Sequence, residues 1–63
     1  MKVGDLVRDQ RDYLGLGLIT GTTKRPTKGG RDIKVQWTDP TRIKELNLPN
    51  NCSWESYKWL EKV

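Results

Sequence analysis

The sequence of 63 residues contains no histidine, no phenylalanine and a single cysteine, Cys52. Without histidine, the chain has no Cys–His nucleophile pair, no imidazole for acid–base catalysis and no Cys–His zinc finger. One cysteine also excludes an internal disulfide, so Cys52 is expected to be a small, semi-buried thiol. From these absences we expect a protein that is not an enzyme and that has no catalytic residues, no metal site and no cofactor.

Alanine is absent as well, whereas valine, isoleucine, threonine, tyrosine and tryptophan recur. Alanine is the strongest helix former, and β-branched and aromatic residues favour strands, so this composition favours an all-β fold. Hydrophobic residues make up 33% of the chain, which is sufficient for one packed layer around a small core. We expect one domain over residues 1–63, with a shallow surface groove in place of an enclosed ligand cavity.

Long hydrophobic runs are also missing. The first residues, Met1 to Asp5, contain no apolar segment of the kind found in signal peptides. No stretch of the sequence approaches the length of a membrane span. We therefore expect a soluble protein in the cytoplasm that makes no contact with a membrane.

The positive charge of the chain is concentrated in residues 24–34, the basic segment. The formal net charge is +4, from 12 Lys and Arg against 8 Asp and Glu. Five of these cations and one carboxylate, Asp32, lie in the basic segment, so the rest of the chain carries seven charges of each sign. The five cations are Lys24, Arg25, Lys28, Arg31 and Lys34. A local excess on a neutral body directs its field at a polyanion, such as nucleic acid, or at an acidic protein surface.

Alternating apolar residues predict five short strands. Their ranges are 2–8, 15–23, 32–38, 52–55 and 59–63. Val3 and Val7 share one face of the first strand at the period-two spacing. In the third strand, Ile33, Val35 and Trp37 face one way. We expect these three side chains to lie in the core.

Glycine and proline divide the strands. The stretch 9–14 is mainly polar and is expected to be an exposed loop. Gly15 and Gly17 mark a bulge, a sharp bend or a close backbone approach in the second strand. Residues 25–31 are expected to form a turn in which Pro26 ends the second strand and a Gly-Gly pair supplies positive φ. The basic segment is therefore expected at the tip of a hairpin that joins the second and third strands.

The segment 39–51 allows two interpretations. Asp39 followed by Pro40 resembles an N-cap with proline at the first helical position, which favours a short helix over 40–46. Otherwise the segment is a 13-residue loop, a length that suggests a role in binding. A tight turn near 56–58 is expected before the last strand.

Five short strands, one of them kinked at glycine, with a turn before the last, fit a small five-stranded barrel. The segments that carry the pattern are Gly4–Val7, Gly15–Ile19, Val35–Trp37 and Trp54–Leu60. The pattern resembles SH3-like barrels of the KOW and Tudor type, and it is similar to small uncharacterised barrel proteins of tailed phages. KOW-type modules bind RNA, ribosomes or RNA polymerase, and Tudor-type modules bind methylated peptide tails through aromatic cages. The resemblance implies a binding module, located in the host cytoplasm or the virion if a phage encodes it.

Two functional hypotheses follow. In the first, the basic hairpin contacts nucleic acid, a ribonucleoprotein or a transcription machine, and Tyr13 or Trp59 offers a stacking face. In the second, the chain is a protein-interaction or structural module in a larger assembly, for example a phage accessory or virion-associated protein. The aromatic C-terminal edge and the 39–51 segment would then carry the contact.

The same residues also have purely structural explanations. The cations could serve only to keep the hairpin soluble, and Trp59 could serve only to cap the barrel. The small core also suits a homo-oligomer.

The acidic residues show no catalytic or metal-binding pattern. Asp5, Asp9 and Asp12 do not follow the spacing of a calcium loop, so we expect them to be solvated loop charges. Glu55 and Glu61 have no neighbouring feature that would prepare them for general acid–base work. Neither set changes the expectation of a non-enzymatic protein.

Overall fold

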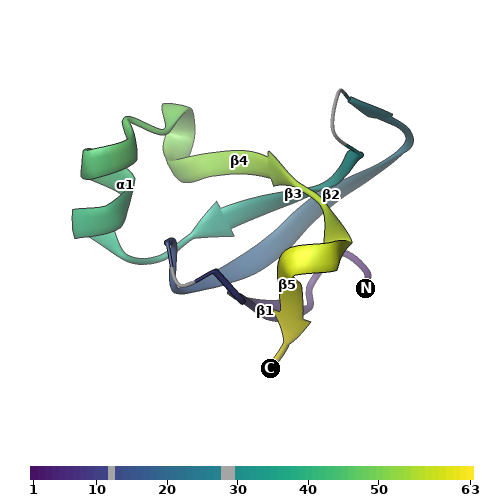
Figure 1. The fold of residues 1–63 in the computed structure, drawn as a ribbon, viewed down its shortest axis with the longest axis horizontal. Helices are drawn as coiled ribbons and strands as arrows, with labels where there is room; N and C mark the ends of the chain where they lie inside the picture. Colours follow the sequence, from purple (N-terminus) through teal and green to yellow (C-terminus); the bar gives the residue numbers. More distant parts are fainter. Residues whose placement is uncertain (12, 28–29) are drawn as a thin grey trace.

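The computed structural model describes residues 1–11, 13–27 and 30–63. Five antiparallel strands form one sheet in the order β4-β3-β2-β1-β5 (Figure 1). The strands are β1 (Leu6–Asp9), β2 (Leu16–Thr27), β3 (Arg31–Trp37), β4 (Cys52–Glu55) and β5 (Leu60–Lys62). The helical segments are α1 (Pro40–Leu46) and the 3-10 turns η1 (Pro49–Asn51) and η2 (Tyr57–Trp59). The all-β class with five strands is confirmed, whereas closure of the sheet into a barrel stays a prediction because β4 and β5 are the two ends of the described ladder.

One face of the sheet forms the core. Val7 of β1, Ile19 of β2 and Val35 of β3 are completely buried, and Trp37 is only 2% exposed. The predicted alternation of the third strand is confirmed, since Ile33 is buried beside Val35 and Trp37. Removing such side chains from water, at about 25 cal/mol per Å² of apolar surface, is the main favourable contribution to folding.

The long strand β2 joins the two halves of the sheet, because it pairs with β1 on one side and β3 on the other. At Gly17 its backbone passes directly over the core. An added Cβ would lie 2.4 Å from Val35 Cγ1 and 2.8 Å from Trp37 Cε3. Of the three roles considered for the strand glycines, a close backbone approach is the one that Gly17 has. The bulge lies further along, where the register with β3 shifts between Ile19 and Gly21.

The helix α1 forms where the sequence predicts it, with the predicted bounds. The Asp39 carboxylate accepts hydrogen bonds from the backbone N–H groups of Thr41 (3.0 Å) and Arg42 (3.3 Å). These bonds satisfy two of the donors that a helix start leaves unpaired, and Pro40 needs none. The helix ends at Leu46 and is followed by the C-cap Asn47, whose left-handed φ of 54° reverses the chain. A loop over the whole 39–51 segment is therefore excluded.

The first predicted strand is wrong at its start. Gly4 has a φ of +96°, and β1 begins only at Leu6. Val3 is 59% exposed, while Val7 is completely buried, so the two valines do not share the core face. The turn at Gly4 breaks the alternation before the strand begins, because positive φ is incompatible with an extended strand.

The exposed loop predicted over 9–14 is confirmed for Gln10, Arg11 and Tyr13 and is wrong at both ends of the stretch. Asp9 is the last residue of β1 and is 1% exposed, and Leu14 belongs to the core. The backbone N–H of Asp9 donates to the carbonyl of Gly15 (3.0 Å), which closes this connection. The expectation of solvated charges is also wrong for Asp9, and the Asp5 side chain is 12% exposed and lies near Lys62. Asp12 lies outside the described residues.

Pro26 does not end the second strand, because β2 continues to Thr27. The ladder with β3 runs from Thr22↔Ile33 to Thr27↔Arg31, so four residues of β2 stand opposite one residue of β3. Proline is tolerated here because the ladder is already interrupted and its missing N–H costs no ladder bond. The hairpin itself is confirmed, although its predicted Gly-Gly tip falls partly outside the described residues.

Candidate functional site

The cations of the basic segment lie along the β2–β3 hairpin. Lys24 and Arg25 are exposed in the irregular part of β2, and Arg31 is exposed where β3 begins. Lys34 is half-buried further along β3, and Lys28 lies outside the described residues. The backbone N–H of Arg25 donates to the Thr23 hydroxyl at 3.1 Å, which holds the bulged stretch of β2 in place. Figure 1 shows the far end of β2 and the beginning of β3 at the opposite end of the molecule's long axis from α1.

Three of these cations lack a carboxylate partner. Within residues 1–11, 13–27 and 30–63, Lys24, Arg25 and Lys34 form no ion pair. Three of the seven cations outside this segment do form ion pairs. Arg8 pairs with Glu61, Arg11 pairs with Asp9 and Glu55, and Lys62 lies 3.9 Å from Asp5. The other four, Lys2, Arg42, Lys44 and Lys58, form no ion pair within the described residues either. What distinguishes the hairpin is that its unpaired cations are concentrated in one short segment, where they remain available to a partner.

Lys34 lies beside an exposed tryptophan on the outer face of the sheet. In the β3–β4 ladder, Lys34 is directly opposite Trp54, which is 36% exposed. On its other side Lys34 faces Gly21, where an added Cβ would come within 3.6 Å of the Lys34 Cβ. Opposite residues of an antiparallel pair point to the same face, so the ammonium and the indole share one surface.

A hollow with a volume of about 220 Å³ lies beside β4. Its lining consists of Lys34, Pro49, Asn50, Cys52, Ser53 and Trp54. We call it the β4 hollow. It opens at the edge of the sheet, because β4 is the first strand of the ladder.

The sequence did not single out Trp54 because the alternation of β4 is inverted. Glu55 pairs with Ile33 and Ser53 pairs with Val35, so the two polar side chains face the core and Trp54 faces outward. The reason is a hydrogen-bonding requirement of the core. Trp37 Nε1 donates to the Ser53 hydroxyl at 2.8 Å. A buried indole N–H needs such an acceptor.

The Ser53 hydroxyl in turn donates to Glu55 Oε2 at 2.7 Å, and Arg11 donates to Glu55 Oε1 at 2.8 Å and to Asp9 Oδ1 at 3.1 Å. The chain Trp37–Ser53–Glu55–Arg11–Asp9 is the buried polar network. It connects β3 and β4 to the end of β1. Its donors and acceptors alternate, so each member except one Asp9 oxygen finds a partner within the described residues.

Arg11 is the cation at the centre of this network, and its side chain is 34% exposed. Partial burial of its guanidinium disfavours the charge, but the hydrogen bonds and negative charges of Asp9 and then Glu55 outweigh burial and raise the pKa of Arg11 above its usual value. The guanidinium lies 4.8 Å from the centre of the Trp59 ring and 5.5 Å from that of Tyr13.

The two predicted stacking residues therefore meet around Arg11. Trp59 is half-buried, and Tyr13 is 58% exposed. No hydrogen bond, ion pair or ring contact among the described residues joins either of them to Lys24, Arg25 or Lys34. The aromatic residue that the fold brings to the basic segment is Trp54.

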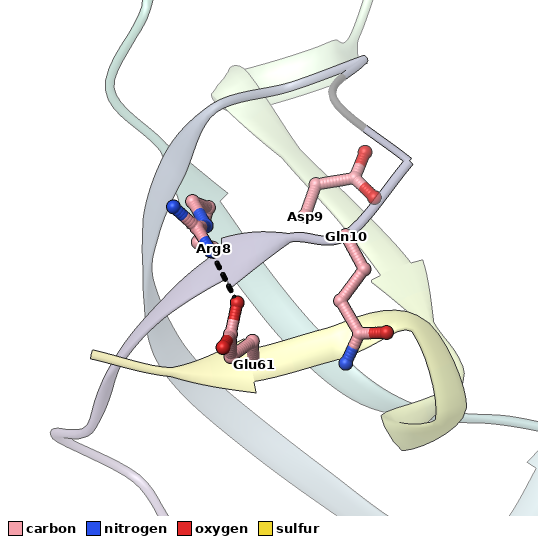
Figure 2. A pocket seen from close by; sticks show the side chains of 4 residues that line it. All are labelled: Arg8, Asp9, Gln10 and Glu61. Carbon is pink, nitrogen blue, oxygen red and sulfur yellow. Dashed lines mark hydrogen bonds and ion pairs between the residues drawn. The ribbon is translucent and has the colours of Figure 1, made fainter.

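Another hollow, of about 440 Å³, lies between β1 and β5 and is lined by Arg8, Asp9, Gln10 and Glu61. Figure 2 shows Arg8 and Glu61 facing each other as an ion pair, whereas the Asp9 carboxylate points away from them. The Gln10 amide donates to the Leu60 carbonyl at 3.2 Å. These groups are occupied with one another, so this hollow offers a ligand less than the β4 hollow does.

The outer face also carries the outer apolar patch, which consists of Leu6, Leu16, Leu18 and Val63. Leu6 is directly opposite Leu18 in the β1–β2 ladder, and the backbone N–H of Val63 donates to the Leu6 carbonyl at 2.9 Å. Contiguous exposed apolar side chains are typical of surfaces that contact other macromolecules.

Neither a metal cluster nor a membrane helix is found where the structure describes the chain. No group of three or more Cys, Asp or Glu side chains among these residues is arranged to hold a metal ion. In the same residues, no helix has the length and apolar composition needed to cross a membrane. Comparison of the chain with protein-family models, with curated proteins and with solved structures found no match. The chemistry of the site itself is therefore what indicates a function.

Proposed function

We propose that this chain is a non-enzymatic binding module that contacts nucleic acid, alone or within a ribonucleoprotein or transcription machine. The contact surface consists of the basic segment and the Lys34–Trp54 pair beside it. The five-stranded antiparallel sheet with a 3-10 turn before its last strand supports an SH3-like barrel of the KOW or phage type as the scaffold. On such a scaffold the hairpin holds its cations away from the neutral body.

The concentration of unpaired cations on the hairpin is the observation that carries this function. Lys24, Arg25 and Lys34 have no carboxylate partner among the described residues and lie within one short segment, whereas the unpaired cations of the body are spread between residues 2 and 58. A cation that binds phosphate displaces counterions from the nucleic acid, and this release supplies most of the affinity of sequence-independent binding. Exposed, unpaired cations suit that role because no internal ion pair has to be broken first.

Titration of fluorescently labelled oligonucleotides at two salt concentrations tests the proposal. If four cations each contact one phosphate, the slope of log affinity against log salt is about −3.6, or a roughly hundredfold loss between about 50 and 200 mM. Lys24→Glu/Arg25→Glu is expected to abolish most of this binding. The matched control is Arg42→Glu/Lys44→Glu, which changes the charge equally on α1, at the opposite end of the molecule.

Two results would overturn the proposal. One is the absence of salt-sensitive binding at protein concentrations of tens of micromolar. The other is an equal loss of affinity in the hairpin variant and the α1 variant, because net charge alone would then explain the binding.

The outer apolar patch supports a second candidate, a protein-interaction or structural module in a larger assembly. The patch lies on the same outer face, and Tyr57 near the C-terminal edge is exposed as well. If a protein partner binds there, Leu16→Gln/Leu18→Gln should abolish binding of the purified partner while Lys24→Glu/Arg25→Glu preserves it. The reverse pattern would exclude this candidate.

A further inference from the structure

Building on the nucleic-acid contact proposed above, we propose that the β4 hollow binds one unstacked base of a single-stranded nucleic acid. Trp54 supplies the stacking surface and Lys34 contacts the adjoining phosphate. The ligand class is therefore a single strand with splayed bases, of RNA or DNA.

The first argument is the pairing of an aromatic face with a cation. Lys34 and Trp54 are directly opposite in the β3–β4 ladder, and their side chains share the outer face. A nucleotide presents an aromatic ring and an anionic phosphate side by side. Stacking on a protein aromatic is worth about 1–3 kcal/mol per base and tolerates any base, because every base has a π face. Lys34 has no carboxylate partner among the described residues, so its charge remains for a phosphate.

The second argument is the polar side chain that shares the hollow with the indole. Asn50 lines the hollow, and its side-chain amide makes no hydrogen bond with any other described residue. An amide offers both a donor and an acceptor, which matches the mixed edge of a nucleobase. The Cys52 thiol donates to the Asn50 carbonyl at 3.2 Å, which holds η1 against the start of β4. Asn50 and Asn51 both have left-handed φ values, 55° and 62°, and these reverse the chain so that η1 lines the hollow.

The third argument is size and access. Ligand pockets for drug-sized molecules have volumes of about 300–1,000 Å³, so a hollow of about 220 Å³ suits one planar ring system. It opens along β4, which is an edge strand of the sheet, and there an extended single-stranded nucleic acid can pass with one base turned into the hollow. A base within a duplex is stacked and paired, and turning it out costs a few kcal/mol. Single strands are therefore favoured.

The basic segment provides the path for the flanking phosphates. Lys34 is two residues from Asp32 on β3, a distance of about 7 Å at the rise of a strand. Asp32 faces the irregular stretch of β2 that contains Lys24 and Arg25. A backbone that leaves the β4 hollow toward the hairpin thus passes the half-buried Asp32 before it reaches Lys24 and Arg25.

Binding by fluorescence anisotropy tests this inference with four probes of equal length: oligothymidylate, oligouridylate, an abasic deoxyribose-phosphate chain and a duplex. The variants are Trp54→Ala, Trp54→Phe and the matched control Tyr57→Ala, which removes an exposed aromatic outside the hollow. Trp54→Ala is expected to weaken binding of one or both single strands by about 5- to 100-fold. Trp54→Phe should retain most of the affinity, and Tyr57→Ala should change it less than about twofold.

The abasic chain and the duplex complete the test. The abasic chain should bind the wild-type protein about as weakly as oligothymidylate binds Trp54→Ala. The affinities of the abasic chain and of the duplex should be the same for wild type and Trp54→Ala. A preference for oligouridylate would assign the site to RNA, and a preference for oligothymidylate would assign it to DNA. Thermal unfolding of each variant shows whether the fold is intact. If Trp54→Ala does not fold, the single variants Trp54→Phe and Asn50→Ala test the site in its place.

The failure of this inference is distinct from that of the proposed function. Equal single-strand affinities for wild type and Trp54→Ala, with a loss in Lys24→Glu/Arg25→Glu, would overturn the base site and leave the nucleic-acid contact standing. An equal loss in Tyr57→Ala would overturn it as well. Binding of no probe at low salt would overturn the nucleic-acid contact itself, and the base site with it.

Discussion

Arg11 and the cations of the basic segment show how the same kind of side chain takes opposite roles in two regions of one small protein. Arg11 lies in the buried polar network, with Asp9 and Glu55 as partners and two aromatic rings beside it. Lys24 and Arg25 lie on an exposed hairpin without a partner among the described residues. A paired, partly buried cation contributes to stability, whereas an exposed, unpaired one leaves stability unchanged and remains available for binding.

The largest effect is expected from breaking the buried polar network at Arg11. Arg11→Gln leaves the Asp9 carboxylate, whose side chain is fully buried, without its cation. Such a loss costs about 3–5 kcal/mol in a fully buried pair, and we expect about 3 kcal/mol because the Arg11 side chain is one-third exposed. Chemical denaturation measures the change. The matched control, Arg25→Gln, should alter stability by less than about 0.5 kcal/mol.

The pH dependence of this loss follows from the raised pKa of Arg11. A group whose pKa is higher in the folded state gives its full stabilisation below its unfolded value and loses it only as the pH rises through the folded value. Both values lie far above neutrality. The difference in stability between wild type and Arg11→Gln should therefore be constant between about pH 7 and pH 9. A steep change in that range would show that another group carries the interaction.

The two halves of β2 provide the next comparison. Gly17→Ala places a methyl group against Val35 and Trp37, and overpacking of this kind costs about 1–3 kcal/mol. Gly21→Ala introduces the same methyl group at ordinary contact distance from Lys34, where the hairpin begins to leave the body. We expect a melting temperature lower by about 4–8 °C per kcal/mol for Gly17→Ala and little change for Gly21→Ala. Equal effects would contradict the close approach at Gly17.

A smaller effect is expected at α1. Asp39→Ala removes the side-chain acceptor for two backbone N–H groups, which costs about 1 kcal/mol. Asp39→Asn should restore most of this stability because asparagine is an equally good N-cap. Nucleic-acid binding should not change in either variant, since α1 lies away from the hairpin and none of its residues lines the β4 hollow. Loss of binding in Asp39→Ala at a temperature where it is folded would place part of the contact surface on α1.

The smallest effect on stability is expected from the hairpin itself. Lys24→Glu/Arg25→Glu should change the free energy of unfolding by less than about 0.5 kcal/mol, since neither cation has a described carboxylate partner. Together with its expected loss of oligonucleotide binding, this variant is the opposite of Arg11→Gln. A large destabilisation would show that the cations hold the hairpin together.

Local patterns predicted the parts of the fold that local interactions determine. The alternation of Ile33, Val35 and Trp37 identified β3, and Asp39 with Pro40 identified α1. Both features depend on residues only a few positions apart. The prediction failed at Asp9, which is buried beside Arg11. The position of Arg11 in turn depends on Glu55, more than forty positions away, so no local pattern reveals it.

The candidate site was predictable only in part. The excess charge of residues 24–34 was visible in the sequence, because a charge count needs no fold. The aromatic partner was not visible, since Tyr13 and Trp59 meet at Arg11 and Trp54 takes the place beside Lys34. Alternation alone would assign Trp54 to the core and Ser53 to the surface.

By itself, the sequence determined the strand-rich composition, the position of the short helix and the local concentration of positive charge. The tertiary structure decided which charges are neutralised and which aromatic side chain lies beside a cation. The physical reason is that burial and pairing depend on neighbours brought together by the ladder of strands. Trp37 requires a hydrogen-bond acceptor in the core, Ser53 supplies it, and Trp54 is thereby turned outward toward Lys34.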